Sequence, residues 1–372
     1  MRAPGICAIL LSPVLAPPAG AQLSPAIWET DLSKRLIDWS ELKEEGPPKD
    51  GIPSLDKPQF EAVAAAASWL VPGEPVVVIE RSGVVRAYPI QILLWHELVN
   101  DEFDDAPILV TYCPLCNSAL AFDRRVKGRT HTFGVAGFLR HNDMVMYDRQ
   151  TDSLWQQITG EAIVGTLTGV QLAPVISRVM PFGAFWKAHP KGQVLSRDTG
   201  YYPGYGQTTY LGYEHGNLDP SYGRAPVRRG ARLNRVLAVV ADGRRRAYTF
   251  DHLRNRGVVE DRLRASRYVI FFEEDVLTAL DTPRIADSRP VGTAAAYIVY
   301  LDGRRLRFLR RDNRIVDRET GSTWDIFGTA VDGPLKGKRL LPMQQAIYFE
   351  FAHRRFYPRA EVVGTAQSGI ER

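Results

Sequence analysis

The stretch PILVTYCPLCNSALAF, residues 107–122, sets a Cys-x-x-Cys pair between two short apolar segments. Residues 107–112 are rich in β-branched and aromatic side chains, a composition typical of a buried strand. Residues 119–122 continue the strand-like pattern after the pair. We therefore expect Cys113 and Cys116 to lie at the end of one buried strand and shortly before the next.

The cysteine pair stands alone in the part of the chain that we expect to be mature. Of the three cysteines, the third, Cys7, lies in a segment predicted to be removed. A disulfide between Cys113 and Cys116 closes a loop of about four residues and contributes roughly 2 kcal/mol, against about 4.7 kcal/mol for a loop of about 100 residues. The pair is therefore better suited to exchanging electrons or holding a soft metal. A local structural disulfide, or two inert buried thiols, is the alternative.

The N-terminus has the pattern of a secretory signal. Arg2 supplies a positive charge, residues 6–16 an apolar run, and residues 19–21 (AGA) a small-x-small cleavage site before Gln22. The apolar run is shorter than the roughly 20 residues that a spanning helix needs. We expect residues 1–21 to be a signal peptide and the mature protein to be periplasmic or secreted, with no transmembrane segment left after cleavage.

Composition and motifs exclude several classes of function. The formal net charge is +5 and the arginine pairs are scattered over the second half without an aromatic-interleaved basic stripe, so we expect no nucleic-acid partner. No Walker loop, dinucleotide glycine pattern or nucleophile-elbow serine is present in the sequence. The expected partner is an unidentified small molecule or another exported protein.

The second half of the chain repeats the first. Residues 76–93 (VVVIERSGVVRAYPIQIL) resemble residues 236–253 (VLAVVADGRRRAYTFDHL), and residues 147–155 (YDRQTDSLW) resemble residues 316–324 (VDRETGSTW). Short strand patterns predominate in both copies, with one or two helices each. We therefore predict an α+β fold of two duplicated, mostly antiparallel, β-rich repeats with short helices.

This duplication divides the chain into six predicted parts. They are the signal peptide (1–21), an N-terminal arm with a short helix (22–74), the first repeat (75–199), a Tyr/Gly-rich loop or linker (200–234), the second repeat (235–363) and a tail (364–372). The second copy lacks the cysteines: Phe272 stands at the position of Cys113 and Asp275 at that of Cys116. His96 also lacks a counterpart. Features confined to the first copy are the better candidates for function.

Three classes of function remain open from the residues alone. The first is a soft-metal site for copper or zinc, with Cys113, Cys116 and His96 as ligands and His141 and Met144 as weaker candidates. The second is a dithiol–disulfide oxidoreductase in which the same cysteines are the redox residues, which requires an exposed thiol with a lowered pKa. The third is a non-catalytic exported binding module with a structural disulfide. Whether the protein is an enzyme is left undecided.

Three long motifs resemble a known protein family. They are WHELVND at residues 95–101, TYCPLCNSALAFDR at residues 111–124 and FGVAGFLRHNDMVMYDRQTDSLW at residues 133–155. All are similar to the domain-of-unknown-function family DUF3179, and the resemblance runs from about residue 50 to residue 358. The family is bacterial and archaeal and often exported, and the resemblance implies no mechanism. An asparagine-serine-aspartate stretch usually occupies the Asn142 region in the family, which weakens His141 as a shared ligand.

The signal pattern makes a direct prediction about the mature N-terminus. Cleavage after Ala21 removes Cys7 and leaves a chain that begins at Gln22. Intact-mass spectrometry of the protein isolated from its host checks this, and a mature product that retains Met1 contradicts it.

Overall fold

The computed structural model describes residues 27–104, 106–201, 204–216 and 233–365. The predicted signal peptide, residues 217–232 of the predicted Tyr/Gly-rich loop and most of the predicted tail lie outside these ranges. Strands predominate over short helices and form several sheets in which nearly all neighbouring strands are antiparallel. The predicted α+β class with mostly antiparallel sheets is confirmed. Within the described residues, no helix is both long and apolar enough to cross a membrane.

The cysteine pair lies in a four-stranded sheet of order β14-β7-β6-β5. Its strands are β5 (Leu98–Phe103), β6 (Ala106–Cys113), β7 (Ser118–Asp123) and β14 (Pro174–Val175). Every residue of β6 is buried, as its apolar and β-branched composition predicts. Cys113 pairs with Ser118 across the hairpin, so the residues between them form the turn, and Asn117 closes it at φ 49°, a conformation that asparagine tolerates.

Two further sheets complete the first half. One has the order β15-β3-β4-β16-β2, with β2 (Phe60–Ala62), β3 (Pro75–Arg81), β4 (Val84–Pro89), β15 (Ser177–Pro181) and β16 (Gln193–Leu195). The other has the order β1-β10-β11-β12-β13, with β1 (Leu42–Glu44), β10 (Phe133–Arg140), β11 (Asp143–Asp148), β12 (Leu154–Gln156) and β13 (Glu161–Val164). The helices are η1 (Trp39–Glu41), α1 (Val63–Ala66), α2 (Ile90–His96) and α3 (Phe182–Ala188), and β8 (Arg125–Val126) and β9 (Arg129–Thr130) form a short hairpin.

The short helix of the N-terminal arm is shorter than its alanine-rich sequence suggests. A helix over residues 60–70 is the natural expectation, but α1 covers only Val63–Ala66. Residues Phe60–Ala62 instead form β2, because they pair with β16 at the sheet edge. Here a tertiary strand pairing overrides the local helix propensity of alanine.

The second half contains elements in a similar order. They are β17 (Arg235–Ala241), β18 (Arg244–Thr249), α4 (Phe250–Arg256), β19 (Val258–Leu263), β20 (Ser266–Glu273), β21 (Thr293–Ile298), β22 (Tyr300–Leu301), β23 (Arg304–Arg305), β24 (Phe308–Arg311), β25 (Arg314–Asp317), β26 (Thr323–Trp324), β27 (Ala330–Asp332), β28 (Gln344–Phe349), α5 (Glu350–Phe356) and β29 (Glu361–Val363), preceded by η2 (Tyr213–His215) and interrupted by η4 (Ile285–Asp287). A hairpin, a short helix and a second hairpin open each predicted repeat, β3–β4, α2 and β5–β6 in the first and β17–β18, α4 and β19–β20 in the second. The element order agrees with the predicted duplication, which stays a prediction together with its domain boundaries.

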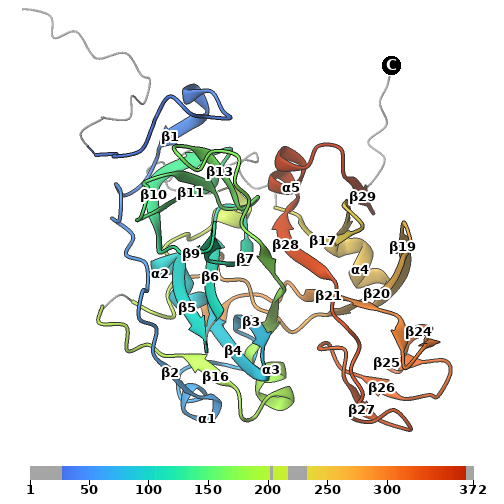
Figure 1. Cartoon of the computed structure of the whole chain (residues 1–372). Coiled ribbons are helices and arrows are strands. Elements are labelled where there is room, and N and C mark those ends of the chain that lie inside the picture. Colours follow the sequence, from blue (N-terminus) through green and yellow to red (C-terminus); the bar gives the residue numbers. More distant parts are fainter. Residues whose placement is uncertain (1–26, 105, 202–203, 217–232, 366–372) are drawn as a thin grey trace, which may run out of the picture.

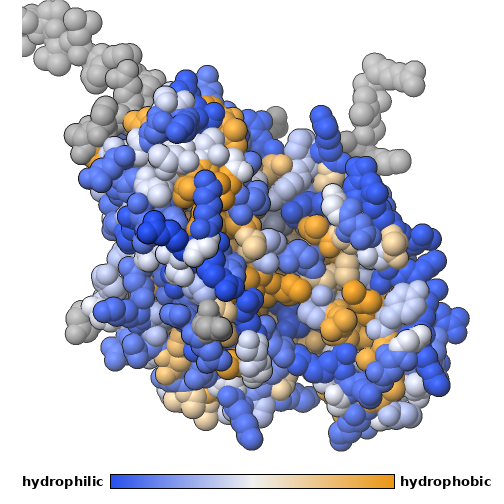
Figure 2. All heavy atoms as spheres, viewed as in Figure 1, coloured by the Kyte–Doolittle hydropathy of each residue, from blue (hydrophilic) through white to orange (hydrophobic). Residues whose placement is uncertain are grey.

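The two halves share one interior. Figure 1 shows the first half, blue to green, beside the second half, yellow to red. The largest apolar cluster contains residues of both, among them Val110, Cys116, Tyr348 and Phe349. Figure 2 shows a mostly hydrophilic face on which apolar residues are concentrated near the middle. The backbone N–H of Phe349 donates to the carbonyl of Cys116 at 2.8 Å, so the second half directly supports the cysteine turn.

The Asp-Arg-x-Thr-x-Ser-x-Trp turns of the two halves are built alike. In each turn the aspartate is buried and accepts a bond of 2.9 Å from the tryptophan Nε1–H, Trp155 to Asp148 and Trp324 to Asp317. We expect Asp317→Ala to lower the free energy of unfolding by about 2–3 kcal/mol, because it leaves a buried indole N–H without an acceptor. Urea unfolding measures this loss. Asp251→Ala, at an exposed position on α4, is the control, and equal losses in both variants would contradict the prediction.

Candidate metal centre

The cysteine turn is buried between β6 and β7. Cys113 is 2 % exposed and Cys116 is 0 % exposed, and both are free thiols. The turn packs against the β10–β11 hairpin, where the carbonyl oxygen of Asn142 accepts hydrogen bonds from both sulfurs, at 3.2 Å from Cys116 Sγ and 3.8 Å from Cys113 Sγ. His141 and Asn142 form that hairpin turn with φ of 55° and 65°. The turn therefore brings the start of β11 onto the thiols.

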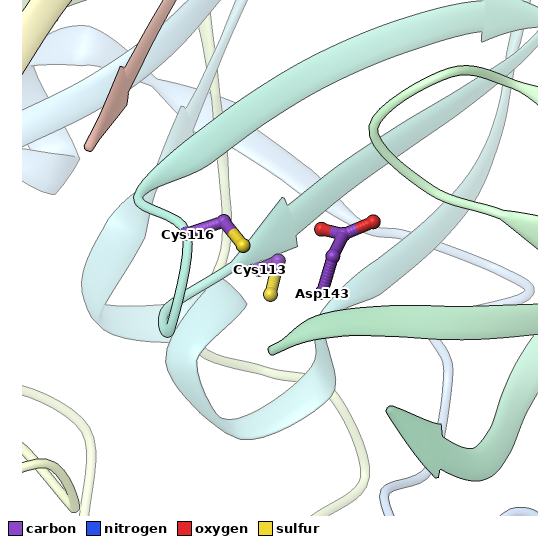
Figure 3. Close-up of side chains that lie close together, drawn as sticks. All are labelled: Cys113, Cys116 and Asp143. Carbon is purple, nitrogen blue, oxygen red and sulfur yellow. The ribbon is translucent and has the colours of Figure 1, made fainter. Parts of the chain in front are cut away.

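Asp143, the first residue of β11, completes a cluster with the two cysteines. One side-chain oxygen of Asp143 and the two sulfurs all lie within 4.8 Å of one another. Figure 3 shows the three side chains meeting where the cysteine turn approaches the start of β11. Asp143 is fully buried. Among the residues that the structure describes, this is the group of three or more Cys, His, Asp or Glu side chains close enough to hold one metal ion.

The carboxylate of Asp143 is only half satisfied by the protein. Its Oδ2 accepts hydrogen bonds from Gln156 Nε2 at 2.6 Å and from the backbone N–H of Ile158 at 2.9 Å. Its Oδ1 has no nitrogen or hydroxyl donor among the described residues, and the thiols of Cys113 and Cys116 are the donors that face the carboxyl. Thiols are weak donors, so a buried carboxylate oxygen beside them favours a proton or a cation.

Burial controls the protonation of the cluster. Burial raises the pKa of Asp143 to about 7, against the opposing hydrogen bonds from Ile158, Gln156 and the two cysteine thiols. Burial also raises the pKa of the Cys113 thiol, and it raises that of Cys116 well above its ordinary value. Without a bound cation the thiols are therefore protonated near neutral pH and are weak nucleophiles.

A cavity of about 390 Å³ reaches the cluster from the surface. Cys113 and Met144 form part of its wall, together with His96, Glu97 and Tyr210. Glu97 is 5 % exposed, and burial, followed by the nearby charge of Asp143, raises its pKa to about 8. The sequence analysis did not single out Asp143 or Glu97 as site residues. The comparison of the two halves could have pointed to Glu97, since the corresponding helix α4 ends at a glycine, Gly257.

The structure places the predicted histidine ligands outside the cluster. His96 lines the cavity, but its Nδ1 lies 2.7 Å from the carbonyl oxygen of Pro53 and its Nε2 lies 2.6 Å from the hydroxyl of Tyr205. The Nε2 of His141 lies 3.2 Å from a carboxylate oxygen of Glu41. The structure brings Cys113 and Cys116 together. Met144 lines the cavity with Cys113, whereas Met146, on the same face of β11, is buried in the core.

Residues 49–360 match the family described as "Protein of unknown function (DUF3179)". This match covers most of the chain. The chain belongs to the DUF3179 family. No curated protein and no solved structure matches it. Membership confirms the resemblance seen in the sequence motifs and supplies no reaction, so any function has to be argued from the site itself.

The raised pKa of Glu97 makes a prediction about stability. A carboxyl whose pKa is higher in the folded state stabilises the fold below its unfolded pKa, and this contribution is lost as pH rises toward about 8. We compare the free energy of unfolding of Glu97→Gln with that of wild type, measured in urea with a chelator present. The variant should gain stability relative to wild type between pH 5 and pH 8. The difference should be on the order of a few kcal/mol, since one pKa unit corresponds to about 1.4 kcal/mol.

The control for this measurement is Glu361→Gln, which changes an exposed carboxyl on β29. Its effect on unfolding should be the same at both pH values. If Glu97→Gln shows the same pH-independent behaviour as Glu361→Gln, the carboxyl of Glu97 is not the group that burial holds in its protonated form.

Proposed function

We propose that this protein binds a thiophilic divalent cation, zinc in the first place, through Cys113, Cys116 and Asp143. One observation carries the proposal: two buried free thiols meet a buried carboxylate oxygen within 4.8 Å, and that oxygen has no nitrogen or hydroxyl donor among the described residues. A divalent cation would displace the protons that burial otherwise retains on these groups, and its two positive charges would offset two of the three negative charges that result. The free energy lost by burying the thiols and the carboxyl is then offset by their bonds to the metal.

The mixture of ligands favours zinc over copper. Zinc is bound in proteins by cysteine sulfur, histidine nitrogen and carboxylate oxygen, whereas Cu(I) prefers thiolate and thioether sulfur without a hard carboxylate. Structural zinc sites use four protein ligands, and sites that bind a substrate or water use three. The cluster offers three, and Cys113 also lines the cavity. A molecule entering the cavity can therefore reach the site.

A dithiol–disulfide oxidoreductase is the second candidate. The observation in its favour is the carboxyl of Asp143, whose pKa of about 7 suits it to accept a proton from an adjacent thiol. Burial of both sulfurs argues against it, because exchange needs a thiolate that a partner disulfide can reach. A binding module with a structural disulfide ranks third, since both thiols are free.

Export of the mature protein is part of the proposal and rests on the N-terminal signal pattern alone. In an oxidising compartment an adjacent pair of free thiols tends to form a disulfide. Burial slows this, and a bound cation would prevent it while the thiolates are coordinated. An exported protein with this cluster therefore has a chemical reason to carry metal.

Metal analysis of the mature protein tests the proposal. We expect about one zinc per chain after loading under reducing conditions, and a loss of affinity of more than about 100-fold in Cys113→Ser, Cys116→Ser or Asp143→Asn, because each removes a direct ligand. His96→Ala is the matched control, since His96 lines the same cavity outside the cluster. Wild type that binds no zinc contradicts the proposal, and so does His96→Ala that loses zinc while folded.

Thiol titration separates the two leading candidates. Metal-free wild type is equilibrated with glutathione redox buffers, and its free thiols are counted by mass after alkylation. Reversible disulfide formation in a wild type that takes up no zinc would favour the oxidoreductase. Zinc uptake with thiols protected from alkylation would favour the metal site.

A further inference from the structure

Glu97 occupies a backbone conformation that the fold normally gives to glycine. It ends α2 with φ 56° and ψ −32°, and Gly257 ends α4 with φ 67° and ψ −37°. A side chain in this region strains the backbone, and such strain is retained where the surrounding structure or a function requires that residue. The second half shows that the turn forms with glycine. In the first half the same turn carries a side chain, and that side chain lines the cavity.

The carboxyl of Glu97 has no structural partner of opposite charge. The hydroxyl of Tyr210 donates a hydrogen bond to it, and none of the described residues places a basic group against it. Two other buried acids have such a partner: Asp101 lies 2.8 Å from Arg86, and Glu214 is bonded to Arg235. A buried acid without a cation weakens the fold, so packing does not explain Glu97.

The cavity in front of Glu97 suits a positively charged organic molecule. The described residues that line it include four large aromatic side chains, Trp95, Phe138, Tyr201 and Tyr210, and no lysine or arginine. Both ring nitrogens of His96 are already hydrogen-bonded. An anion entering this cavity would meet carboxyl groups and no cation. An ammonium group, in contrast, would stabilise the ionised form of Glu97 and lie against aromatic faces, two interactions that favour it.

We propose that this cavity binds a small organic cation, with its ammonium group at Glu97 and its apolar body against the aromatic wall. The volume of about 390 Å³ is at the small end of ligand pockets, so the molecule has about the size of a single substituted ring. The site uses Glu97, whereas the proposed metal site uses Cys113, Cys116 and Asp143. The inference concerns the metal-free protein, because Cys113 lines the same cavity.

Calorimetric titration of the full mature protein with three ring compounds of equal size tests the proposal. The probes are benzylamine, benzyl alcohol and benzoate, which are cationic, neutral and anionic, and the protein is kept metal-free with a chelator. We expect benzylamine to bind at least about tenfold more tightly than benzyl alcohol, because only the amine forms a buried charge pair. Benzoate should not bind. Equal binding of amine and alcohol, or no binding of the amine at millimolar concentration, overturns the proposal.

Substitutions then assign the charge to Glu97. Glu97→Gln should weaken benzylamine binding by at least about tenfold and leave benzyl alcohol unaffected. Glu74→Gln is the matched control, because Glu74 is a buried carboxyl that is bonded to Gln91 and lies outside the cavity. An unchanged affinity for benzylamine in Glu97→Gln overturns the assignment.

A second variant guards against a folding defect. Glu97→Gly restores the residue that the backbone conformation favours, so its melting temperature should equal or exceed that of wild type. It should lose benzylamine binding all the same. A well-folded Glu97→Gly that keeps wild-type affinity for the amine overturns the proposal. Zinc content, measured separately on the same variants, reports on the metal site alone.

Discussion

Three proton-bearing groups, the thiols of Cys113 and Cys116 and the carboxyl of Asp143, share a space almost out of contact with solvent. Desolvation disfavours the charged form of each, and the proximity of three such groups disfavours it further. Their stable states are therefore fully protonated or neutralised by a cation. This constraint explains the raised pKa values, the poor suitability of the thiols for exchange and the suitability of the cluster for a divalent ion.

The surrounding structure maintains this constraint from several sides. The carbonyl of Cys116 is held by the backbone N–H of Phe349, and the carbonyl of Leu115 accepts a bond of 2.7 Å from the hydroxyl of Tyr213. Tyr213 is followed by Glu214, which is bound by Arg235 and Arg289. The cysteine turn is thus fixed by the second half and by the segment that precedes it. A site held this rigidly has little freedom to rearrange, which suits defined coordination.

The two halves use similar elements for different ends. The sequence comparison set Phe272 against Cys113, but the strand pairing shifts this by one residue: Glu273 ends β20 where Cys113 ends β6. The same register sets Gly257 against Glu97. In the second half the turn residue is a glycine, and the acid at the end of β20 is paired with Arg310. In the first half Cys113 and Glu97 line one cavity, and neither is paired with a described basic side chain. Buried ionisable groups that lower the stability of the fold, gathered around one cavity, are characteristic of a functional site.

The sequence by itself determined the strand on either side of the cysteine pair, the mostly antiparallel α+β class, the matching Asp–Trp turns and the family. These depend on local composition, on hydrophobic pattern or on motif identity, which are readable along the chain. Only the tertiary structure decided that Asp143 joins the thiols and that His96 stays outside the cluster. Asp143 reaches them because β10 and β11 pair in a hairpin that packs on the cysteine turn, and His96 is retained by Pro53 and Tyr205. Such contacts join residues distant in the chain, and no local pattern encodes which distant segments will meet.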